Sequence, residues 1–480
     1  MRGLRSTILA AAACAALTVP AAAATGQPAG GPAAALAATS RLSPRALAEA
    51  VRISPDWRHI GQVFTGPPPT TKICEQQFKI ACYQPAQLQQ AYGLPSLLQA
   101  GITGKGQTIV IVDSFGSPTV AHDLAAFDAA FHLPAPPSLT VIQPAGKVPA
   151  YRPTPNREGW AGETDLDVEW AHVMAPGASL LLVETPTSEN EGTTGFPQIV
   201  AAENYVISNH LGGVISQSFS ATEQTFPARQ TVLALRGAIT AAARAGVTML
   251  AASGDSGAAD VKFNGTTYYL HPVTSWPDSD PLVTGVGGTQ LTLGKAGNRT
   301  APDQVWNDTY NAAANQFILG GSGPSPLASG GGKSVFFARP AYQDQVRAVV
   351  GGRRGVPDIS MSAACNGAVD MYQSYPGQPA GWYPTCGTSE ATPLFAGVVA
   401  LAGQLAGHPL GPINPRLYAL AARHDPGIAD ITTGSNTVSV SQAGAHTITG
   451  FTASPGYDLA SGLGTVNAPA FVYALAGVRR

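Results

Sequence analysis

The chain has 480 residues, of which 44% are hydrophobic and 12% are charged, and its formal net charge is -2. This composition supplies enough apolar side chains for a buried core in one large domain or two ordinary ones. The net charge is close to neutral and the sequence has neither a basic stripe nor an acidic tail, so no nucleic acid is expected as a partner.

The N-terminus has the pattern of a secretory signal. Residues 1–5 are positively charged, residues 6–19 are apolar, and residues 20–24 are small and suit cleavage by a signal peptidase. We therefore predict a signal peptide over 1–24 and a secreted, extracellular protein. No later segment is long and apolar enough to cross a bilayer, so no membrane association is expected once the signal is removed.

Residues 25–82, rich in Ala, Pro and Gly at first, are interpreted as a leader or short pro-segment before a domain at 83–480. Outside the signal the cysteines are Cys74, Cys82, Cys365 and Cys386. Export and proximity favour the disulfides Cys74–Cys82 and Cys365–Cys386, although the two other connectivities stay open. No cysteine has zinc-site spacing with a histidine.

From residue 83 onward, short apolar runs alternate with helical stretches. Strands are expected at 108–113, 179–184, 213–216 and 247–253, and helices at 123–132, 233–245 and 392–407. Continuous apolar strands separated by helices predict an α/β fold with a parallel sheet covered by helices on both faces. Functional residues collect at the carboxyl ends of such strands, and Asp255 directly follows one.

Three short segments carry complementary chemistry: Glu163-Thr-Asp-Leu-Asp167, Ser253-Gly-Asp255-Ser-Gly and Gly387-Thr-Ser389-Glu-Ala-Thr-Pro. Glu163 and Asp167 are four residues apart, which on a helix puts both on one face. A serine hydroxyl needs a neighbouring base, and a carboxylate pair that shares a proton supplies one in acid. A carboxyl group at the oxyanion donates only while it is protonated.

Each motif has a simpler interpretation when it is taken alone. Asp165 and Glu169 form a second pair with the same spacing, and such pairs commonly lie on a solvated helix face. Gly-Thr-Ser before a helix is often a cap, and Asp255-Ser-Gly also occurs in aspartic proteases, which need a second such triplet that this chain lacks. Spacing alone does not choose between the two acidic pairs.

Taken together and in this order, the motifs resemble the sedolisin (serine-carboxyl peptidase) family, and the resemblance covers about residues 83–480. Further matching segments include Ser216-Gln-Ser-Phe-Ser, Gly330-Gly-Gly-Lys-Ser and Arg354-Gly-Val-Pro-Asp358. The resemblance implies a subtilisin-like fold with a single catalytic domain. It also implies that Ser389 is the nucleophile, Glu163 the general base, Asp167 the acid that orients this base, and Asp255 the oxyanion donor.

A calcium site is also implied by the resemblance. Asp430 and Ile431, with Ser454, Gly456 and Asp458, match the segments that hold one Ca²⁺ in the family, although the family usually has Gly where Ser454 stands. Carboxylate and carbonyl oxygens suit this hard cation.

We therefore expect a secreted, monomeric serine-type endopeptidase or tripeptidyl peptidase that acts on polypeptides in acid. Its substrates should bind as an extended strand along Ser218, Phe219 and Ser220. A subtilisin-type serine protease is one alternative, although no histidine here lies in a His-Gly-Thr segment. A secreted binding protein that kept the fold without turnover is the other.

Overall fold

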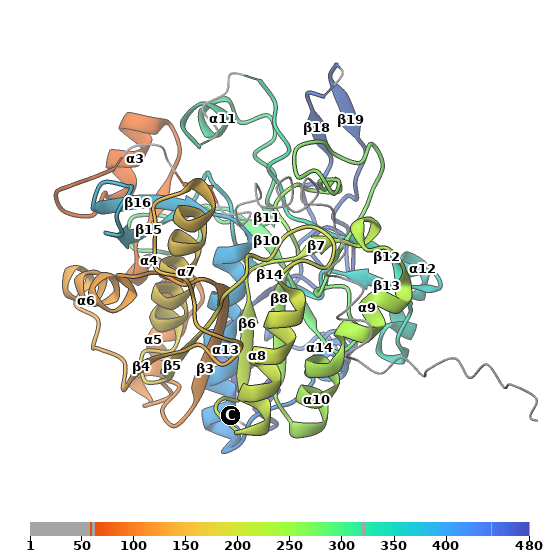
Figure 1. Ribbon diagram of the computed structural model, residues 1–480, viewed down its shortest axis with the longest axis horizontal. Coiled ribbons are helices and arrows are strands. Elements are labelled where there is room, and N and C mark those ends of the chain that lie inside the picture. The colour runs from red at the N-terminus through yellow and green to blue at the C-terminus, as the bar shows by residue number, and fades with distance from the viewer. Residues whose placement is uncertain (1–57, 60–62, 319–322, 443, 480) are drawn as a thin grey trace, which may run out of the picture.

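The computed structural model describes residues 58–59, 63–318, 323–442 and 444–479, so the predicted signal peptide lies outside the described residues. An eight-stranded sheet forms the centre of the molecule (Figure 1). Its strands run in the spatial order β11-β10-β8-β6-β3-β5-β4, and β14 also pairs with β10. All pairings are parallel except that of β11 with β10.

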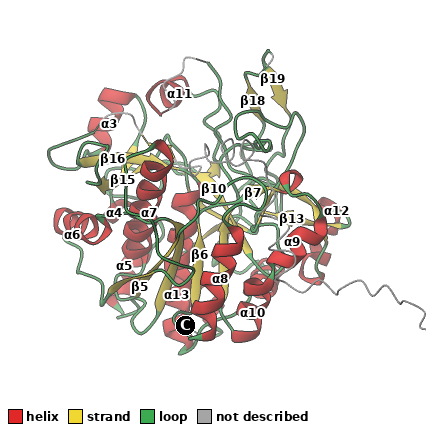
Figure 2. Cartoon of the chain, viewed as in Figure 1, coloured by secondary structure: helices red, strands yellow, loops and turns green. Residues whose placement is uncertain are grey.

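Alternating apolar residues on the central strands determine which helices cover each face of the sheet. On β3, Ile109 and Ile111 point into one core with α7 and α13, whereas Val110 and Val112 point into a second core with α8 and α10. Strands that are buried on both faces read as continuous apolar runs, which is why the sequence identified them. The predicted α/β fold, with helices on both faces of a parallel sheet, is confirmed (Figure 2).

The strands of the central sheet, in chain order, are β3 Thr108–Ser114, β4 Leu139–Ile142, β5 Ser179–Thr185, β6 Val214–Gln217, β8 Thr248–Ala252, β10 Thr284–Gln290, β11 Gln304–Val305 and β14 Ile359–Ser362. Smaller sheets contain β1 Arg58–His59, β2 Cys82–Tyr83, β7 Ala221–Thr222, β9 Ser275–Trp276, β12 Gly332–Ala338, β13 Arg353–Val356, β15 Ala368–Gln373, β16 Gly381–Cys386, β17 Ile428–Ala429, β18 Val438–Val440, β19 His446–Ile448 and β20 Thr465–Val466.

The α-helices are α3 Thr71–Phe78, α4 Pro85–Ala91, α5 Leu94–Gln99, α6 Val120–Phe131, α7 Pro155–Met174, α8 Phe196–Ser208, α9 Arg229–Leu235, α10 Gly237–Ala245, α11 Ala312–Ile318, α12 Arg347–Val350, α13 Thr388–Ala406, α14 Asn414–Ala422 and α15 Ala468–Ala476. Two short 3₁₀ helices cover Glu223–Thr225 and Ala341–Val346. None of these helices, within the described ranges, is both long and apolar enough for a bilayer.

Two expectations differ from the structure. The helix expected at 233–245 is split into α9 and α10 at Arg236, whose ψ of 7° leaves the helical range and whose guanidinium donates to both oxygens of Asp280. Residues of the expected leader or pro-segment 25–82 also pair with the domain expected at 83–480, which the sequence pattern did not indicate. Cys82 is paired with Ala368 in β15, and Phe64 exchanges backbone hydrogen bonds with Trp382. Local apolar patterning does not register such long-range pairings.

Candidate active site

The first acidic pair lies on α7, which packs against α13 and the sheet. Thr154 caps this helix by accepting from the Arg157 N–H, and Pro155 is its first residue. Glu163 and Asp167 both have 0% exposure, so the helix face that carries them is fully covered. The prediction that they share a helix face is confirmed by the extent of α7.

Ser389 lies in the first turn of α13, directly after the turn at Gly387. Gly387 has a φ of 136°, which favours glycine, and its N–H donates to Ala363 O. The Ser389 hydroxyl donates to Ser218 O at 3.5 Å and also faces the Glu163 carboxyl, whose pKa it lowers. Neither Glu163 oxygen forms a hydrogen bond of normal length among the described residues, as is common for catalytic contacts without substrate.

Burial is the main cause that raises the pKa of Glu163 well above its ordinary value, and the neighbouring Asp167 raises it further. The pKa of Asp167 is also raised well above its ordinary value, first by burial and then by Asp113, while the hydroxyl of Ser218 opposes this by donating to Asp167 Oδ1 at 2.7 Å. Two adjacent buried carboxyls hold at least one proton in acid because both charges cannot be accommodated.

Asp113 lies outside the three sequence motifs, yet its carboxyl adjoins Glu163 and Asp167. It is fully buried near the end of β3, and burial raises its pKa to about 7. Its charge acts on both Glu163 and Asp167. Its position at the carboxyl end of a parallel strand was the available signal.

Asp255 follows β8 and is joined to the Gly387–Ser389 turn, which carries the predicted nucleophile and is named the nucleophile turn. The backbone N–H and the hydroxyl of Thr388 both donate to Asp255 Oδ1, each at 2.7 Å. Thr388 Oγ1 in turn accepts from the Gly254 N–H at 3.2 Å. The structure thus places Asp255 beside the residue that precedes Ser389, and it brings all four sequence-predicted catalytic residues together.

Glu390, the residue after Ser389, is fully buried as well. Burial raises its pKa well above the ordinary value, the Ser362 hydroxyl opposes this, and Asp255 adds to it. Two buried carboxyls, Asp255 and Glu390, are therefore close to the turn that carries Ser389.

The second acidic pair, Asp165 and Glu169, lies on the opposite side of α7 and contacts other elements. Asp165 accepts from the Ser117 hydroxyl at 3.3 Å and lies within hydrogen-bonding reach of Asp123 on α6. Glu169 accepts from the Tyr372 N–H in β15 at 3.1 Å. Both side chains are buried, so this pair is not on a solvated face as the simpler interpretation supposed.

The segment expected to bind substrate follows β6 directly. The Ser218 hydroxyl points to Asp167, and the Phe219 ring is buried against Trp160 and Phe196. Ser220 is half-buried. A peptide at this edge would therefore meet backbone rather than the Ser218 and Phe219 side chains.

The five residues predicted to hold calcium lie in two adjoining loops. Asp430 Oδ2 accepts from the Gly456 N–H at 2.8 Å, and Asp458 Oδ2 accepts from the Ser454 N–H at 3.1 Å. Ile431 is buried, and burial raises the pKa of Asp458. Backbone N–H groups of the segment 454–458 therefore hold both carboxylates, and the predicted ligands are these carboxylates and the backbone oxygens of Ile431, Ser454 and Gly456. This all-oxygen donor set fits a hard cation.

In the structure the cysteines form the two disulfides Cys74–Cys82 and Cys365–Cys386, with S–S distances of 2.01 Å and 2.00 Å. The first joins α3 to β2, and the second joins the segment after β14 to the end of β16.

The comparisons with known proteins agree with this geometry. The pattern of the subtilase family (Peptidase_S8) matches residues 158–416, more than half of the chain. Kumamolisin from Bacillus sp. (strain MN-32) is 31% identical over 390 residues, covering 80% of this chain and 62% of the relative. The chain belongs to the sedolisin family.

Two further sedolisin relatives extend the comparison. Sedolisin from Pseudomonas sp. (strain 101) is 29% identical over 76% of this chain and 57% of the relative. Human tripeptidyl-peptidase 1 is 30% identical over 66% of this chain and 52% of the relative. The structure of Pseudomonas sedolisin with two molecules of pseudo-iodotyrostatin superposes with a TM-score of 0.68 at 26% identity, covering 83% of this chain and 99% of that one. The chain thus spans about three fifths or less of these curated relatives, and its fold is the subtilisin-like fold of the sedolisins.

Proposed function

We propose that this sedolisin-family protein is a secreted serine-carboxyl peptidase that hydrolyses peptide bonds in acid. The observation that carries the proposal is the Ser389 hydroxyl facing the buried carboxyl pair Glu163 and Asp167. A histidine base of the subtilisin type has no support here. All nine histidines are described, only His172 is buried, and it bonds to Pro134 O and Asp128.

The geometry supports a role for each member of this pair. Ser389 Oγ attacks the scissile carbonyl carbon while Glu163 takes its proton. Asp167 holds the Glu163 carboxyl in place and shares a proton with it, and the Ser218 hydroxyl fixes Asp167. Glu163 then passes the proton to the leaving amine, and in the second half of the reaction it activates the water that releases the acyl group.

Asp255 supplies the oxyanion donor in this proposal. Thr388 donates twice to its Oδ1, which orients the carboxyl beside the nucleophile turn. A proton on the other oxygen would then be donated to the oxyanion as negative charge develops. Activity therefore requires acid for two reasons. The carboxyl pair Glu163 and Asp167 must share a proton, and the Asp255 carboxyl must hold another.

Polypeptides are the proposed substrates, bound in extended form beside Ser218, Phe219 and Ser220. The relatives include proteins named as tripeptidyl-peptidases and a serine-carboxyl proteinase, so both internal cleavage and removal of tripeptides are consistent with the family. We propose that the protein acts as a monomer after export, in keeping with the predicted signal peptide at 1–24.

We also propose one Ca²⁺ held by the carboxylates of Asp430 and Asp458 and by the carbonyls of Ile431, Ser454 and Gly456. The ion would neutralise the two carboxylates and tie the loops together. Its proposed contribution is to stability rather than to the reaction.

The deciding experiment digests an unfolded protein with the purified wild type and with Ser389→Ala at several pH values, and sequences the products. Acid-dependent cleavage by the wild type alone would support the proposal, and the product lengths would separate internal cleavage from release of tripeptides. Cleavage that survives in Ser389→Ala, or no cleavage by either protein, would contradict it. Labelling of Ser389 by a peptide aldehyde or fluorophosphonate separates a peptidase from a binding protein on the same fold.

A further inference from the structure

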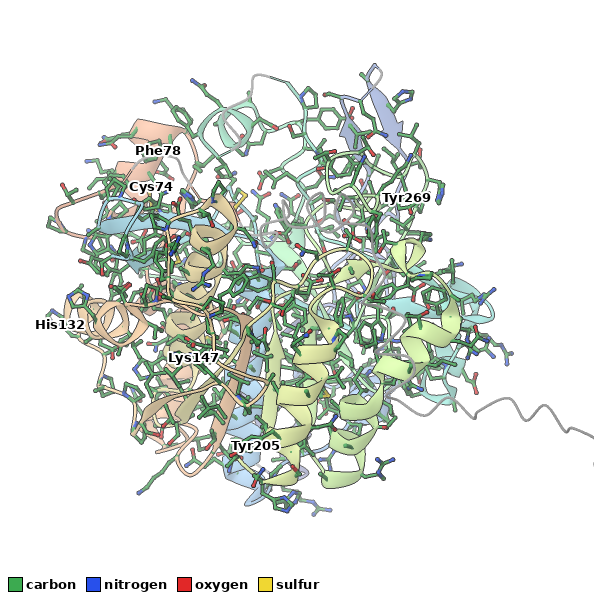
Figure 3. All side chains as sticks on the ribbon, viewed as in Figure 1. Cys74, Phe78, His132, Lys147, Tyr205 and Tyr269 are labelled. Carbon is green, nitrogen blue, oxygen red and sulfur yellow. A yellow bond between two sulfur atoms is a disulfide. The ribbon has the colours of Figure 1, made fainter. Side chains whose placement is uncertain are left out.

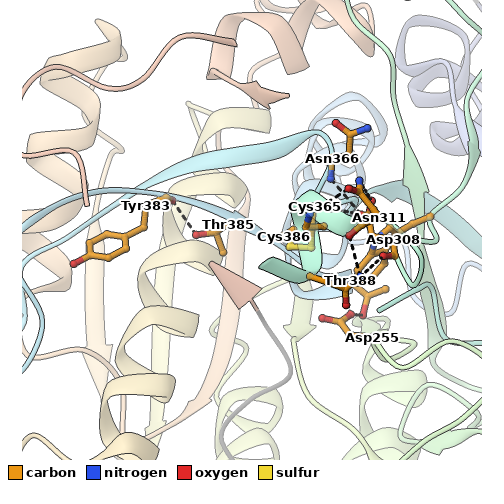
Figure 4. Close-up of a disulfide and its surroundings, with 12 residues drawn as sticks. Asp255, Asp308, Asn311, Cys365, Asn366, Tyr383, Thr385, Cys386 and Thr388 are labelled. Carbon is orange, nitrogen blue, oxygen red and sulfur yellow. Dashed lines mark hydrogen bonds between the residues drawn. A yellow bond between two sulfur atoms is a disulfide. The ribbon is translucent and has the colours of Figure 1, made fainter. Parts of the chain in front are cut away.

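Asp308 is a buried carboxylate that organises the region behind the nucleophile turn (Figure 4). It has 1% exposure, and its Oδ2 accepts from the Trp306 ring N–H at 2.9 Å and from the backbone N–H groups of Cys365 and Asn366 at 2.8 and 3.2 Å. Its Oδ1 accepts from Asn311 Nδ2 at 2.9 Å. No lysine or arginine within the described ranges forms an ion pair with it, so these four donors hold the carboxylate.

Cys365, which Asp308 binds, is linked to the nucleophile turn by two connections. The disulfide joins Cys365 to Cys386, the residue directly before the Gly387-Thr-Ser389 turn. The Gly387 N–H also donates to Ala363 O at 2.9 Å, two residues before Cys365. The position of the turn that carries Ser389 therefore depends on the segment 363–365.

Asp255, whose carboxyl is the proposed oxyanion donor, is also connected to Asp308 through its backbone oxygen. The Ala328 N–H donates to Asp255 O at 2.9 Å, and the Asp308 N–H donates to Leu327 O at 2.8 Å. Thr388 closes the circuit by donating to Asp255 Oδ1. The path runs from Asp308 to Cys365, across the disulfide to Cys386, through Thr388 to Asp255, and through 327–328 to Asp308 again.

We propose that Asp308 and the Cys365–Cys386 disulfide form a positioning clamp that sets the distance between the Ser389 turn and the Asp255 carboxyl. This inference rests on the proposed peptidase function. Asp308, Cys365 and Cys386 touch no reacting atom and act through Thr388 and Asp255. A closed circuit of buried contacts holds two groups more precisely than a single contact does, because each link restrains both ends. Displacement of about 1 Å at a catalytic group can cost on the order of 10²-fold in rate.

The chain contains a matched control for the disulfide. Cys74–Cys82 is equally buried but packs in a separate apolar cluster with Phe78 and Ile80, on the α3 side of the molecule (Figure 3). No hydrogen bond in the circuit involves either of these cysteines. Removing either disulfide should lower stability, whereas only removal of Cys365–Cys386 should lower the turnover of folded enzyme.

A control for Asp308 is Asp303, a buried carboxylate in the same part of the chain. Asp303 binds the Arg299 guanidinium with both oxygens and takes no part in the circuit. Asp308→Asn replaces one accepting oxygen of the carboxylate with an NH₂ group, which then faces another donor. Asn311 cannot compensate by reversing its amide, because its Oδ1 already accepts from the N–H groups of Ala313 and Ala314.

The test measures kcat and KM in acid, below the melting temperature, for the wild type, Ser389→Ala, Cys365→Ala/Cys386→Ala, Asp308→Asn and the two controls, Cys74→Ala/Cys82→Ala and Asp303→Asn. Each clamp variant should lose about 10²-fold in kcat with KM nearly unchanged, since the contact matters mainly in the transition state. Combining Asp308→Asn with the cysteine pair should cost no more than either change alone. The controls should melt earlier with kcat unchanged.

Several results would overturn the clamp. Wild-type kcat in Asp308→Asn and in the cysteine variant would do so, as would additive losses or an equal loss of kcat in the controls. If only the cysteine variant fails to fold, Asp308→Asn decides. If neither clamp variant folds, the role is structural and the proposal is wrong. Failure of the peptidase function has a different signature, because the wild type would then be as inactive as Ser389→Ala.

Discussion

The two acidic faces of α7 have the same spacing and the same burial, yet they meet different neighbours. Glu163 and Asp167 face Ser389 and Ser218, whereas Asp165 and Glu169 face α6 and β15. Burial raises the pKa of all four carboxyls well above their ordinary values. A raised pKa therefore does not by itself identify a catalytic group.

The neighbours of each face provide the distinction. A serine at the start of a buried helix gives the first pair a reaction partner. The second pair has backbone and hydroxyl donors, together with Asp123, which is itself held by Thr119 and Ser374. The second face thus resembles a proton-dependent contact of α7 with α6 and β15, whereas the first has the surroundings expected of a general base.

The largest expected effect lies on the first face. Ser389→Ala and Glu163→Gln should each lower kcat by on the order of 10⁴-fold or more and leave folding intact, and the double variant should be little worse than either. Asp165→Asn and Glu169→Gln are the matched controls on the other face and should retain activity in acid. Steady-state kinetics at the acid optimum, with circular dichroism for folding, make the measurement. If the controls were the inactive pair, the assignment of the two faces would be reversed.

A smaller loss is expected at Asp255, because it donates to the transition state rather than forming a bond. Asp255→Ala should cost about 2.7–4 kcal/mol in transition-state stabilisation. Asp255→Asn keeps a donor at every pH, so it should lose less and should extend activity toward neutral pH. Full pH–rate profiles of both variants make the comparison. An Asn variant as weak as the Ala variant at every pH would assign Asp255 a structural role.

The second face should control how stability depends on pH. The pKa of Asp165 is raised in the fold, so its stabilising contribution is fully present below its unfolded pKa and is lost as pH rises through the folded pKa. Asp165→Asn should remove this loss and narrow the difference between the melting temperatures at pH 4 and pH 7. The gain near neutral pH should be about 1.4 kcal/mol for each pKa unit by which the fold raises Asp165.

Asp344→Asn is the control for that measurement, because this carboxylate is 59% exposed in a surface ion pair with Arg339. Asp344→Asn should leave the difference between the melting temperatures at pH 4 and pH 7 unchanged. If this difference in melting temperature is also unchanged in Asp165→Asn, the second face does not govern how stability depends on pH.

The smallest expected effect concerns Asp430 and Asp458, the carboxylates proposed to hold the calcium ion. A bound ion stabilises only the folded state, and it adds about 2.7 kcal/mol to the free energy of unfolding when the free ion is at 100 times its Kd. A chelator should therefore lower the melting temperature of the wild type. Asp430→Ala or Asp458→Ala should abolish this sensitivity. Asp425→Ala should retain it, because the Asp425 carboxylate accepts from the Gly427 N–H and is not one of the proposed ligands. Identical melting curves with and without chelator would exclude the site.

The sequence alone predicted the central sheet, and it singled out four candidate catalytic residues that the structure brings together. Strands such as Thr108–Ser114 are buried on both faces, so their apolar runs are visible without a structure. The proposed catalytic residues lie in short motifs whose order along the chain identifies the family. The two disulfides also matched the simplest pairing, because each joins cysteines that are close in sequence.

Only the tertiary structure decided which residues surround those motifs. It separated the two acidic faces of α7, brought Asp113 next to Glu163 and Asp167, paired Cys82 with β15, and gathered Asp308, Cys365 and Thr388 around the turn that carries Ser389. Spacing reports which side chains share a face of one element, but it cannot report which distant segment covers that face. Packing across the whole chain determines which segment covers each face. In this protein it determines whether a buried carboxyl of α7 faces Ser389 or faces α6 and β15.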